Sequence, residues 1–195
     1  MLVLASASPR RRELLLNAGI PFTVQIPHVD EQAKPGEDAV AYVQRIAAKK
    51  AEAVKAAAED LVLAADTVVS LNGAILGKPI SAAEASMMLK ALSGNTHEVL
   101  TVICLRYGSR SLVDLSVTKV TFLTLGEEDI AEYVRSGEPM DKAGAYGIQG
   151  IASRFVHSVQ GCYFNVVGLP VSLVCQRIVD LGWSIQDLQP VGPPE

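Results

Sequence analysis

The sequence predicts a mixed α/β fold, in which helices cover a sheet of both parallel and antiparallel strands. Strand-like and helix-like segments alternate along the chain, a pattern that favours strands joined through helices. An Asn72-Gly73 dipeptide between two apolar runs is a strong signal for an antiparallel hairpin. Hydrophobic residues make up 49% of the 195, enough apolar surface for a sizeable core. A purely parallel, doubly wound sheet is therefore not expected.

The first half of the chain alternates between short strands and helices. Ser8 at the N-cap position, Pro9 at the first helical position and Gly19 beyond the last turn delimit the first helix. Asp38 caps a second, longer helix. The expected segments are a strand at 2–5, a helix at 9–18, a strand at 22–26, a polar loop at 27–38, a helix from 38 to about 58, a strand at 61–65 ending at Asp66 and the hairpin at 68–76.

The second half begins with the capping box Ser81-Ala82-Ala83-Glu84, which opens a helix. The expected segments are that helix from 81 to about 94, strands at 98–106 and 112–123, a helix at 127–137, a glycine-rich stretch at 144–150, strands near 155–159 and 165–167, and a helix from 170 to about 181. We expect one domain over residues 1–188. Residues 189–195 contain three prolines and a glycine and are expected to form a flexible tail.

Charge and apolar patterning argue against several classes of protein. The chain has 17 basic and 21 acidic residues, a net charge of −4, whereas a general nucleic-acid binder usually carries a basic face. Its apolar runs are broken well before the ~20 residues that a membrane helix needs. The segment Met1–Ala5 has no basic region and is too short for a signal peptide, so we expect a cytoplasmic protein.

Cysteines and histidines show no spacing typical of disulfide frameworks or zinc sites. The odd number of cysteines and the absence of CxxC predict small buried apolar side chains instead. No GxSxG elbow is present, so neither a serine hydrolase nor a zinc enzyme is expected. The residues concerned are Cys104, Cys162, Cys175, His28, His97 and His157.

The segment from Ser6 to Arg12 places three arginines in the first turn of a helix that follows a strand. Helix N-termini present free N–H groups and a partial positive charge, so acidic residues are usual there. Arginines at that position favour a bound anion such as phosphate, for which the guanidinium fork is well suited. The alternative is that these arginines are simply solvated. No Walker loop is present in the chain.

Acidic residues in two segments offer oxygen ligands for a divalent cation. Asp66 follows an apolar strand, at the position where α/β proteins place their ligands, and Thr67 adds a hydroxyl. Asp30-Glu31, in the loop before the long helix, gives a second acidic point. Two carboxylates facing a triphosphate indicate Mg²⁺ or Mn²⁺. The alternatives are an aspartate that caps a turn and a solvated acidic pair.

Two lysines complete this set. On the long helix, Lys50 falls in the middle of the apolar stripe, whereas Lys49 and Lys55 fall outside it. An inward lysine needs a partner, which a bound phosphate would supply. The alternatives are that it reaches solvent or pairs with an acidic neighbour. Lys78 lies on a rigid turn before Pro79, where lysines are usually only solvated.

Taken together, these segments resemble the Maf family of nucleoside triphosphate pyrophosphatases. The matching segments occur in the family's order and cover most of the chain. They are Ser6-Ala7-Ser8-Pro9-Arg10-Arg11-Arg12-Glu13-Leu14-Leu15, Ala65-Asp66-Thr67-Val68, Gly77-Lys78-Pro79, Leu92-Ser93-Gly94-Asn95-Thr96-His97 and Glu138-Pro139-Met140-Asp141-Lys142-Ala143-Gly144-Ala145-Tyr146-Gly147-Ile148-Gln149-Gly150.

The resemblance implies a two-lobed α/β fold with a central cleft, similar to that of inosine triphosphate pyrophosphatases, and a homodimer. It implies hydrolysis of a nucleoside triphosphate to the monophosphate and pyrophosphate with a divalent metal. Asp66 matches the family's proton acceptor. The other matched positions handle phosphate and metal (Ser6, Arg11, Glu31, Lys50 and Lys78) or are linked to base choice (Arg10, Thr67 and Gln149).

The segment from Asp141 to Gly150 is similar to the branch of the family that acts on dTTP and UTP, which implies a house-cleaning role in nucleotide metabolism. Three alternatives remain open on the sequence alone. They are a 7-methyl-GTP pyrophosphatase, a non-catalytic nucleotide-binding regulator of cell division, and a metal-dependent phosphatase that releases inorganic phosphate.

Overall fold

The computed structural model describes residues 1–188, so the tail predicted at 189–195 lies outside the described residues. Within them, seven strands form one mixed sheet in the order β2-β1-β3-β5-β6-β7, with β4 paired to β3. The bounds are β1 (Leu2–Ala5), β2 (Thr23–Gln25), β3 (Leu61–Leu71), β4 (Ala74–Leu76), β5 (Thr96–Tyr107), β6 (Arg110–Phe122) and β7 (Val156–Gln160). Strand β1 runs parallel to β2 and β3, and the other pairs are antiparallel, which confirms the predicted mixed sheet.

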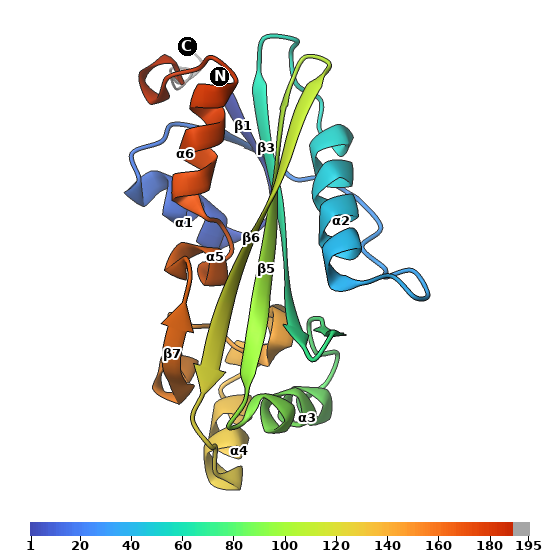
Figure 1. The fold of residues 1–195 in the computed structure, drawn as a ribbon, viewed down its shortest axis with the longest axis vertical. Coiled ribbons are helices and arrows are strands. Elements are labelled where there is room, and N and C mark those ends of the chain that lie inside the picture. Colours follow the sequence, from blue (N-terminus) through green and yellow to red (C-terminus); the bar gives the residue numbers. More distant parts are fainter. Residues whose placement is uncertain (189–195) are drawn as a thin grey trace.

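Helices cover both faces of this sheet (Figure 1). Their bounds are α1 (Pro9–Asn17), α2 (Ala39–Ala53), α3 (Ala82–Leu92), α4 (Glu127–Arg135), α5 (Tyr163–Val167) and α6 (Val171–Asp180). Four short 3-10 helices are η1 (Glu138–Asp141), η2 (Ala143–Ala145), η3 (Ile151–Phe155) and η4 (Ile185–Asp187). No helix within residues 1–188 is both long enough and apolar enough to cross a membrane.

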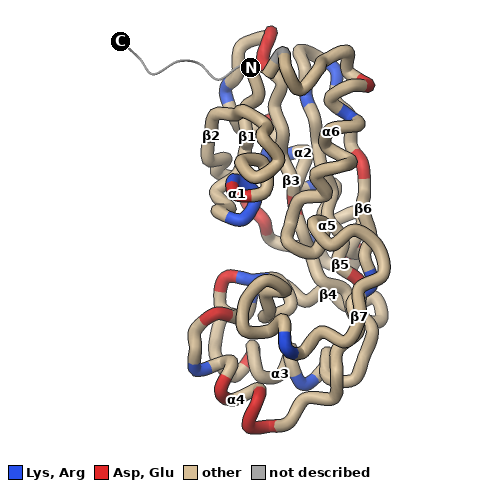
Figure 2. Tube along the Cα trace, turned by 90° about the vertical axis from the view of Figure 1, so that its left-hand side faces the viewer, with Lys and Arg blue, Asp and Glu red and all other residues tan. Residues whose placement is uncertain are grey.

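Two lobes share the long strands β3, β5 and β6 (Figures 1 and 2). We call the part with β1, β2, α1, α2 and α6 the upper lobe, and the part with β4, α3, α4, η1 and η2 the lower lobe. Side chains alternate along β3, so Val62, Ala64 and Val68 pack in the cluster under α2. Leu61, Leu63, Ala65 and Val69 pack in the larger core on the opposite face. Residues of one strand thus supply both faces of the sheet.

Local sequence signals account for most of the element ends. The side chain of Ser8 accepts a hydrogen bond from the Arg11 N–H, and that of Asp38 accepts one from Ala41. In the β3–β4 hairpin, Asn72 and Gly73 have φ of 52° and 84°, the left-handed values that a type I′ turn requires. The N-caps and the hairpin predicted from these residues are confirmed.

One predicted strand and the end of one predicted helix are wrong, and tertiary contacts explain both. Residues 165–167 lie in helix α5 rather than in a strand, because the buried Asn165 side chain donates to the Val99 carbonyl and the Thr118 hydroxyl, both at 2.9 Å. Helix α2 ends at Ala53 instead of near 58. There Arg106 donates to the carbonyls of Ala51 and Val54 and so satisfies the end of the helix from outside.

Burial of His97 predicts a pH-dependent stability. The ring is 1% exposed, and burial lowers the pKa of His97 from 6.5 to about 4. An unfolded chain binds a proton on this ring below pH 6.5, whereas the folded protein resists protonation until near pH 4. As pH falls from 6.5 to about 4, we therefore expect the free energy of unfolding to decrease by about 3 kcal/mol because of His97.

Urea unfolding at pH 7 and pH 4.5 measures this effect. The loss of stability between the two pH values should be smaller in His97→Gln than in the parent protein, because glutamine takes up no proton. His157→Gln, at an exposed position on β7, is the matched control and should behave like the parent. Equal losses in His97→Gln and the parent protein would contradict the assignment.

Candidate active site

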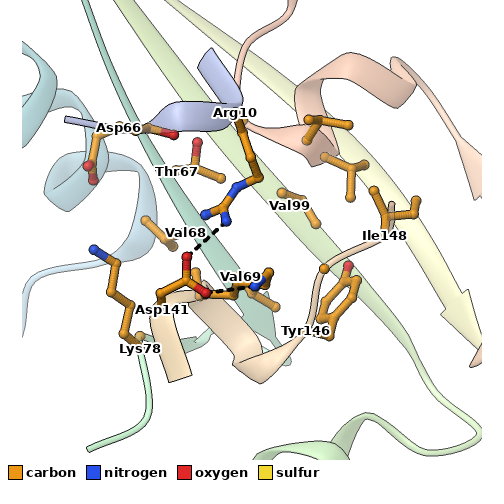
Figure 3. Close-up of a pocket in the computed structure, with 18 of the residues that line it drawn as sticks. Arg10, Asp66, Thr67, Val68, Val69, Lys78, Val99, Asp141, Tyr146 and Ile148 are labelled. Carbon is orange, nitrogen blue, oxygen red and sulfur yellow. Dashed lines mark hydrogen bonds and ion pairs between the residues drawn. The ribbon is translucent and has the colours of Figure 1, made fainter. Parts of the chain in front are cut away.

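A cavity of about 510 Å³ lies between the two lobes. The upper lobe contributes residues from the start of α1, from α2 and from the loop before it. The lower lobe contributes η1, η2 and the segment that follows them, and β3 passes through both (Figure 3). A second, smaller cavity adjoins it, shares Lys50 and Lys78 with it, and includes Ser6. Eight of the nine predicted site residues line the main cavity, and Ser6 lines the smaller one.

The ammonium of Lys50 holds two carboxylates at one wall of the cavity. Its Nζ lies 2.7 Å from Asp66 Oδ1 and 2.8 Å from Glu31 Oε1. Lys50 is 8% exposed, which confirms that it faces inward, as helical periodicity predicted. Ile46 and Tyr42 lie about one and two turns before Lys50 on the same row of α2. The Tyr42 hydroxyl donates to the Glu31 carbonyl at 3.0 Å and so fastens the acidic loop to the helix.

Asp66 reaches the cavity because of where β1 ends. The prediction that the strand stops at Asp66 is wrong, since β3 continues to Leu71. Strand β1 ends at Ala5, which pairs with Ala64, so β3 loses its parallel neighbour just before Asp66. The cavity opens beyond this end, and both Asp66 and Thr67 line it although they point to opposite faces of the sheet. Asp66 therefore still lies beside the carboxyl end of a parallel strand, but that strand is β1 rather than β3.

The two carboxylates fit a divalent cation. Asp66 and Glu31 converge on one positive point, and Mg²⁺ is commonly held by one or two carboxylates together with water and substrate phosphates. Among the residues that the structure describes, no group of three or more His, Cys, Asp or Glu side chains could hold a metal by itself. A cation bound here would therefore share its coordination with the substrate.

Arg11 is held mainly by the protein itself. Its Nε donates to the Gly168 carbonyl at 2.8 Å, Nη1 donates to the Ala65 carbonyl at 2.8 Å and to Ser6 Oγ at 3.3 Å, and Nη2 donates to Thr67 Oγ1 at 3.0 Å. Burial lowers the pKa of Arg11, while the nearby Asp66 carboxylate opposes that shift. Within residues 1–188, this leaves one N–H on Nη2 for a substrate.

Arg10 and Lys78 present positive charge at the cavity. Arg10 crosses the cleft to Asp141 of η1, at 3.1 Å, and Lys142 holds the other oxygen of that carboxylate at 2.6 Å (Figure 3). Burial alone would raise the pKa of Asp141, but the hydrogen bonds from Lys142 and Arg10 outweigh it and lower the pKa. In the part of the chain described, Lys78 is exposed and has no ion pair or hydrogen bond, so its ammonium is available to an anion.

The other end of the cavity is apolar. Val69, Val99, Tyr146 and Ile148 lie there (Figure 3). Gln149 borders it with an exposed side chain whose amide makes no hydrogen bond among residues 1–188. A cavity with cations and carboxylates at one end and apolar groups with a free amide at the other suits a ligand that is anionic at one end and has a planar, hydrogen-bonding group at the other.

Comparison with known proteins places this arrangement in a family. A family model described as Maf-like protein matches residues 1–181. The chain belongs to the Maf family. It is 49% identical over 185 residues to a dTTP/UTP pyrophosphatase of Symbiobacterium thermophilum, with 94% of this chain and 95% of that protein covered. It is 54% identical over 172 residues to a dTTP/UTP pyrophosphatase of Shigella boydii, with 87% of each chain covered.

Among solved structures, the chain is similar to a HAM1 protein from Coxiella burnetii. The TM-score is 0.49 at 20% sequence identity, with 92% of this chain and 98% of that chain covered.

Two residues at the site of this Maf protein had no individual role in the prediction from sequence. Asp141 faces Arg10 across the cleft, and Tyr42 anchors the loop that carries Glu31. Helical spacing could have placed Tyr42 on the same face as Lys50, because it lies two four-residue steps before Lys50 on the predicted helix. No sequence signal indicated that Asp141 and Arg10 would meet, because they are 131 residues apart and on different lobes.

The hydrogen bonds of Arg11 predict a structural role that Lys cannot fill. Arg11→Lys leaves several buried acceptors without a donor and should lower the free energy of unfolding by about 3 kcal/mol. Urea denaturation measures the loss, and Arg12→Lys, at the neighbouring position that does not line the cavity, is the control. Equal stability of the two variants would show that Arg11 is not a structural support.

Proposed function

We propose that this Maf protein hydrolyses nucleoside triphosphates to the monophosphate and pyrophosphate, with dTTP and UTP as its preferred substrates. The observation that carries the proposal is the pairing of Lys50 with Asp66 and Glu31 at one end of a cavity whose other end is apolar. Relatives about half identical over most of the chain, named dTTP/UTP pyrophosphatases, support the choice of substrates.

The charged end of the cavity would bind the triphosphate. Lys78 has no partner among the described residues, so it can pair with phosphate without first breaking an ion pair. Arg10 would exchange Asp141 for phosphate, and Arg11 would offer the remaining N–H of Nη2. Ser6 in turn accepts hydrogen bonds from Arg11 and from the Ser8 N–H, so it orders the loop in front of α1. These contacts would stabilise charge as it moves toward the leaving pyrophosphate.

Asp66 is the proposed proton acceptor. Asp66 is 6% exposed and its carboxylate is ion-paired with Lys50, which keeps it in place at the cavity wall. A water between Asp66 and the triphosphate would lose its proton to that carboxylate as it attacks phosphorus. Mg²⁺ or Mn²⁺, held through Asp66 and Glu31, would supply neutralisation of the phosphate charge. Lys50 holds both carboxylates at the same wall of the cavity.

The apolar end would bind the base. Gln149 has a free amide that can donate to and accept from the edge of a pyrimidine, while Val69, Val99 and Tyr146 would contact its ring. The Thr67 hydroxyl already bonds to Arg11 and Thr101, so its influence on base choice would pass through those neighbours. We further propose a cytoplasmic homodimer, as the family resemblance implies.

The assay is pyrophosphate release from dTTP, UTP, CTP, GTP and 7-methyl-GTP with Mg²⁺ or Mn²⁺. We expect release from dTTP and UTP, and we expect Asp66→Asn to lower kcat by at least about a hundredfold while nucleotide binding persists. Asp129→Asn, on the exposed start of α4, is the matched control and should retain activity.

Each alternative gives its own result in this assay. Binding without release of any product would indicate a nucleotide-binding regulator, and inorganic phosphate in place of pyrophosphate would indicate a phosphatase. A preference for 7-methyl-GTP would move the protein to the other branch of the family. Full activity of Asp66→Asn would remove Asp66 from the catalytic role.

A further inference from the structure

The short segment that carries Gln149 into the cavity is fastened at both ends to the lower lobe. The Gly150 N–H donates to the Gly147 carbonyl at 3.1 Å, so residues 147–150 form a tight turn with Ile148 and Gln149 at its corners. Ile148 is buried and Gln149 is exposed at the cavity. The direction in which Gln149 points is therefore set by how this turn sits on the residues beneath it.

Tyr133 and Glu138 hold the two ends of the turn. The Gly147 N–H donates to the Tyr133 hydroxyl at 3.2 Å, and the Ile151 N–H donates to Glu138 Oε2 at 3.0 Å. The two supports are themselves joined, because the Tyr133 hydroxyl donates to Glu138 Oε1 at 3.0 Å. We call this pair, Tyr133 and Glu138, the turn clamp. It links α4 and η1 to both sides of Gln149 by three hydrogen bonds in series.

The glycines that flank the turn show how closely the clamp approaches the backbone. A Cβ on Gly150 would overlap the Glu138 carboxylate, and a Cβ on Gly147 would come within 2.7 Å of Lys142 Cε. Neither glycine has the positive φ that would explain its choice by backbone conformation. Both positions therefore lack a side chain because Glu138 and Lys142 pack directly against the turn.

Tyr133 is a rigid anchor for this clamp. Its ring is fully buried and meets Phe155 edge-on, with centroids 5.4 Å apart. Burial raises the pKa of Tyr133, so its hydroxyl keeps its proton and can donate to Glu138 while it accepts from Gly147. The hydroxyl is thus used fully by the turn and by Glu138, and it does not line the cavity itself.

We propose that Tyr133 and Glu138 are positioning residues for base selection, which act by fixing the turn at 147–150 so that the Gln149 amide meets one edge of the base. The inference rests on the proposed function. Tyr133 does not line the cavity, whereas Glu138 does. Among the described residues, neither has a hydrogen bond or ion pair with Asp66, Glu31 or Lys50 at the phosphate end. Loss of the clamp is therefore expected to alter which base is preferred, more than it alters the rate of hydrolysis of a bound substrate.

Tyr133→Phe tests the clamp, because it removes one hydroxyl and keeps the buried ring. We expect the ratio of kcat/KM for dTTP to that for CTP to fall about three- to tenfold, the size expected when one hydrogen bond to a base is misdirected. Hydrogen exchange at the amides of residues 147–151 should become faster. Tyr107→Phe, in the upper lobe and outside the cavity, is the matched control and should change neither quantity.

Gln149→Ala shows whether the effect passes through Gln149. In that background, Tyr133→Phe should change the dTTP to CTP ratio by less than about twofold, because the side chain it positions is gone. An equal change with and without Gln149 would overturn the inference, as would an unchanged ratio in Tyr133→Phe. Glu138→Gln, with Glu132→Gln as its exposed control, repeats the test if Tyr133→Phe does not fold.

Dissociation constants of the same nucleotides, measured in the Asp66→Asn background, separate this inference from the proposed function. If the parent protein released no pyrophosphate, the proposed function would fail, but a clamp-dependent ranking of dissociation constants would still support the inference. If Tyr133→Phe leaves the ranking of the dissociation constants unchanged, the inference is overturned even in an active enzyme. Absence of nucleotide binding would overturn both.

Discussion

The ion pairs of Lys50 with Asp66 and Glu31 are the interactions on which the rest of the site depends. A buried ammonium without a partner costs several kcal/mol, so packing Lys50 inside the apolar face of α2 requires acids within reach. Asp66 comes from β3, where β1 ends, and Glu31 comes from the loop before α2. Three separate segments are thereby fixed around one charge. The same arrangement leaves two carboxylates aimed at the point where a triphosphate and its cation would meet.

Both lobes line the cavity, and Lys78, which follows β4 of the lower lobe, lies with the charged groups. Under the proposed function, the upper lobe would place Lys50, Arg10 and Arg11 near the phosphates, and the lower lobe would place Tyr146 and Gln149 near the base. Strand β3 belongs to both, so the distance between the charged and the apolar ends is set by a single rigid element. The Arg10–Asp141 ion pair joins the lobes at the cleft, and a phosphate that competes for Arg10 would act on that contact directly.

Features that depend on neighbouring residues were predictable from the sequence. The caps at Ser8 and Asp38, the hairpin at Asn72-Gly73 and the inward direction of Lys50 follow from turn chemistry and helical periodicity, and the structure confirms them. The prediction that these residues form one site depended on the family resemblance as much as on their spacing. Lys78 and Gln149 lie on turns whose local sequence gives no strong signal of its own.

Features that depend on distant residues were not predictable. The run Asn165-Val166-Val167 favours a strand locally, but hydrogen bonds from Asn165 to β5 and β6 fix a short helix instead. Arg11 was expected to bind phosphate, whereas most of its donors are directed to carbonyls and hydroxyls from segments far along the chain. Such partners are set by the completed sheet, which no single stretch of sequence describes.

The most direct test of the account is the affinity of Mn²⁺ for the protein in complex with the α,β-methylene analogue of dTTP, measured by the electron paramagnetic resonance signal of free Mn²⁺. If Asp66 and Glu31 form the cation site, Asp66→Asn and Glu31→Gln should each weaken Mn²⁺ binding by at least about tenfold. Asp30→Asn, at the neighbouring acid that does not line the cavity, should bind Mn²⁺ like the parent protein. Unchanged affinity in Asp66→Asn and Glu31→Gln would contradict the account.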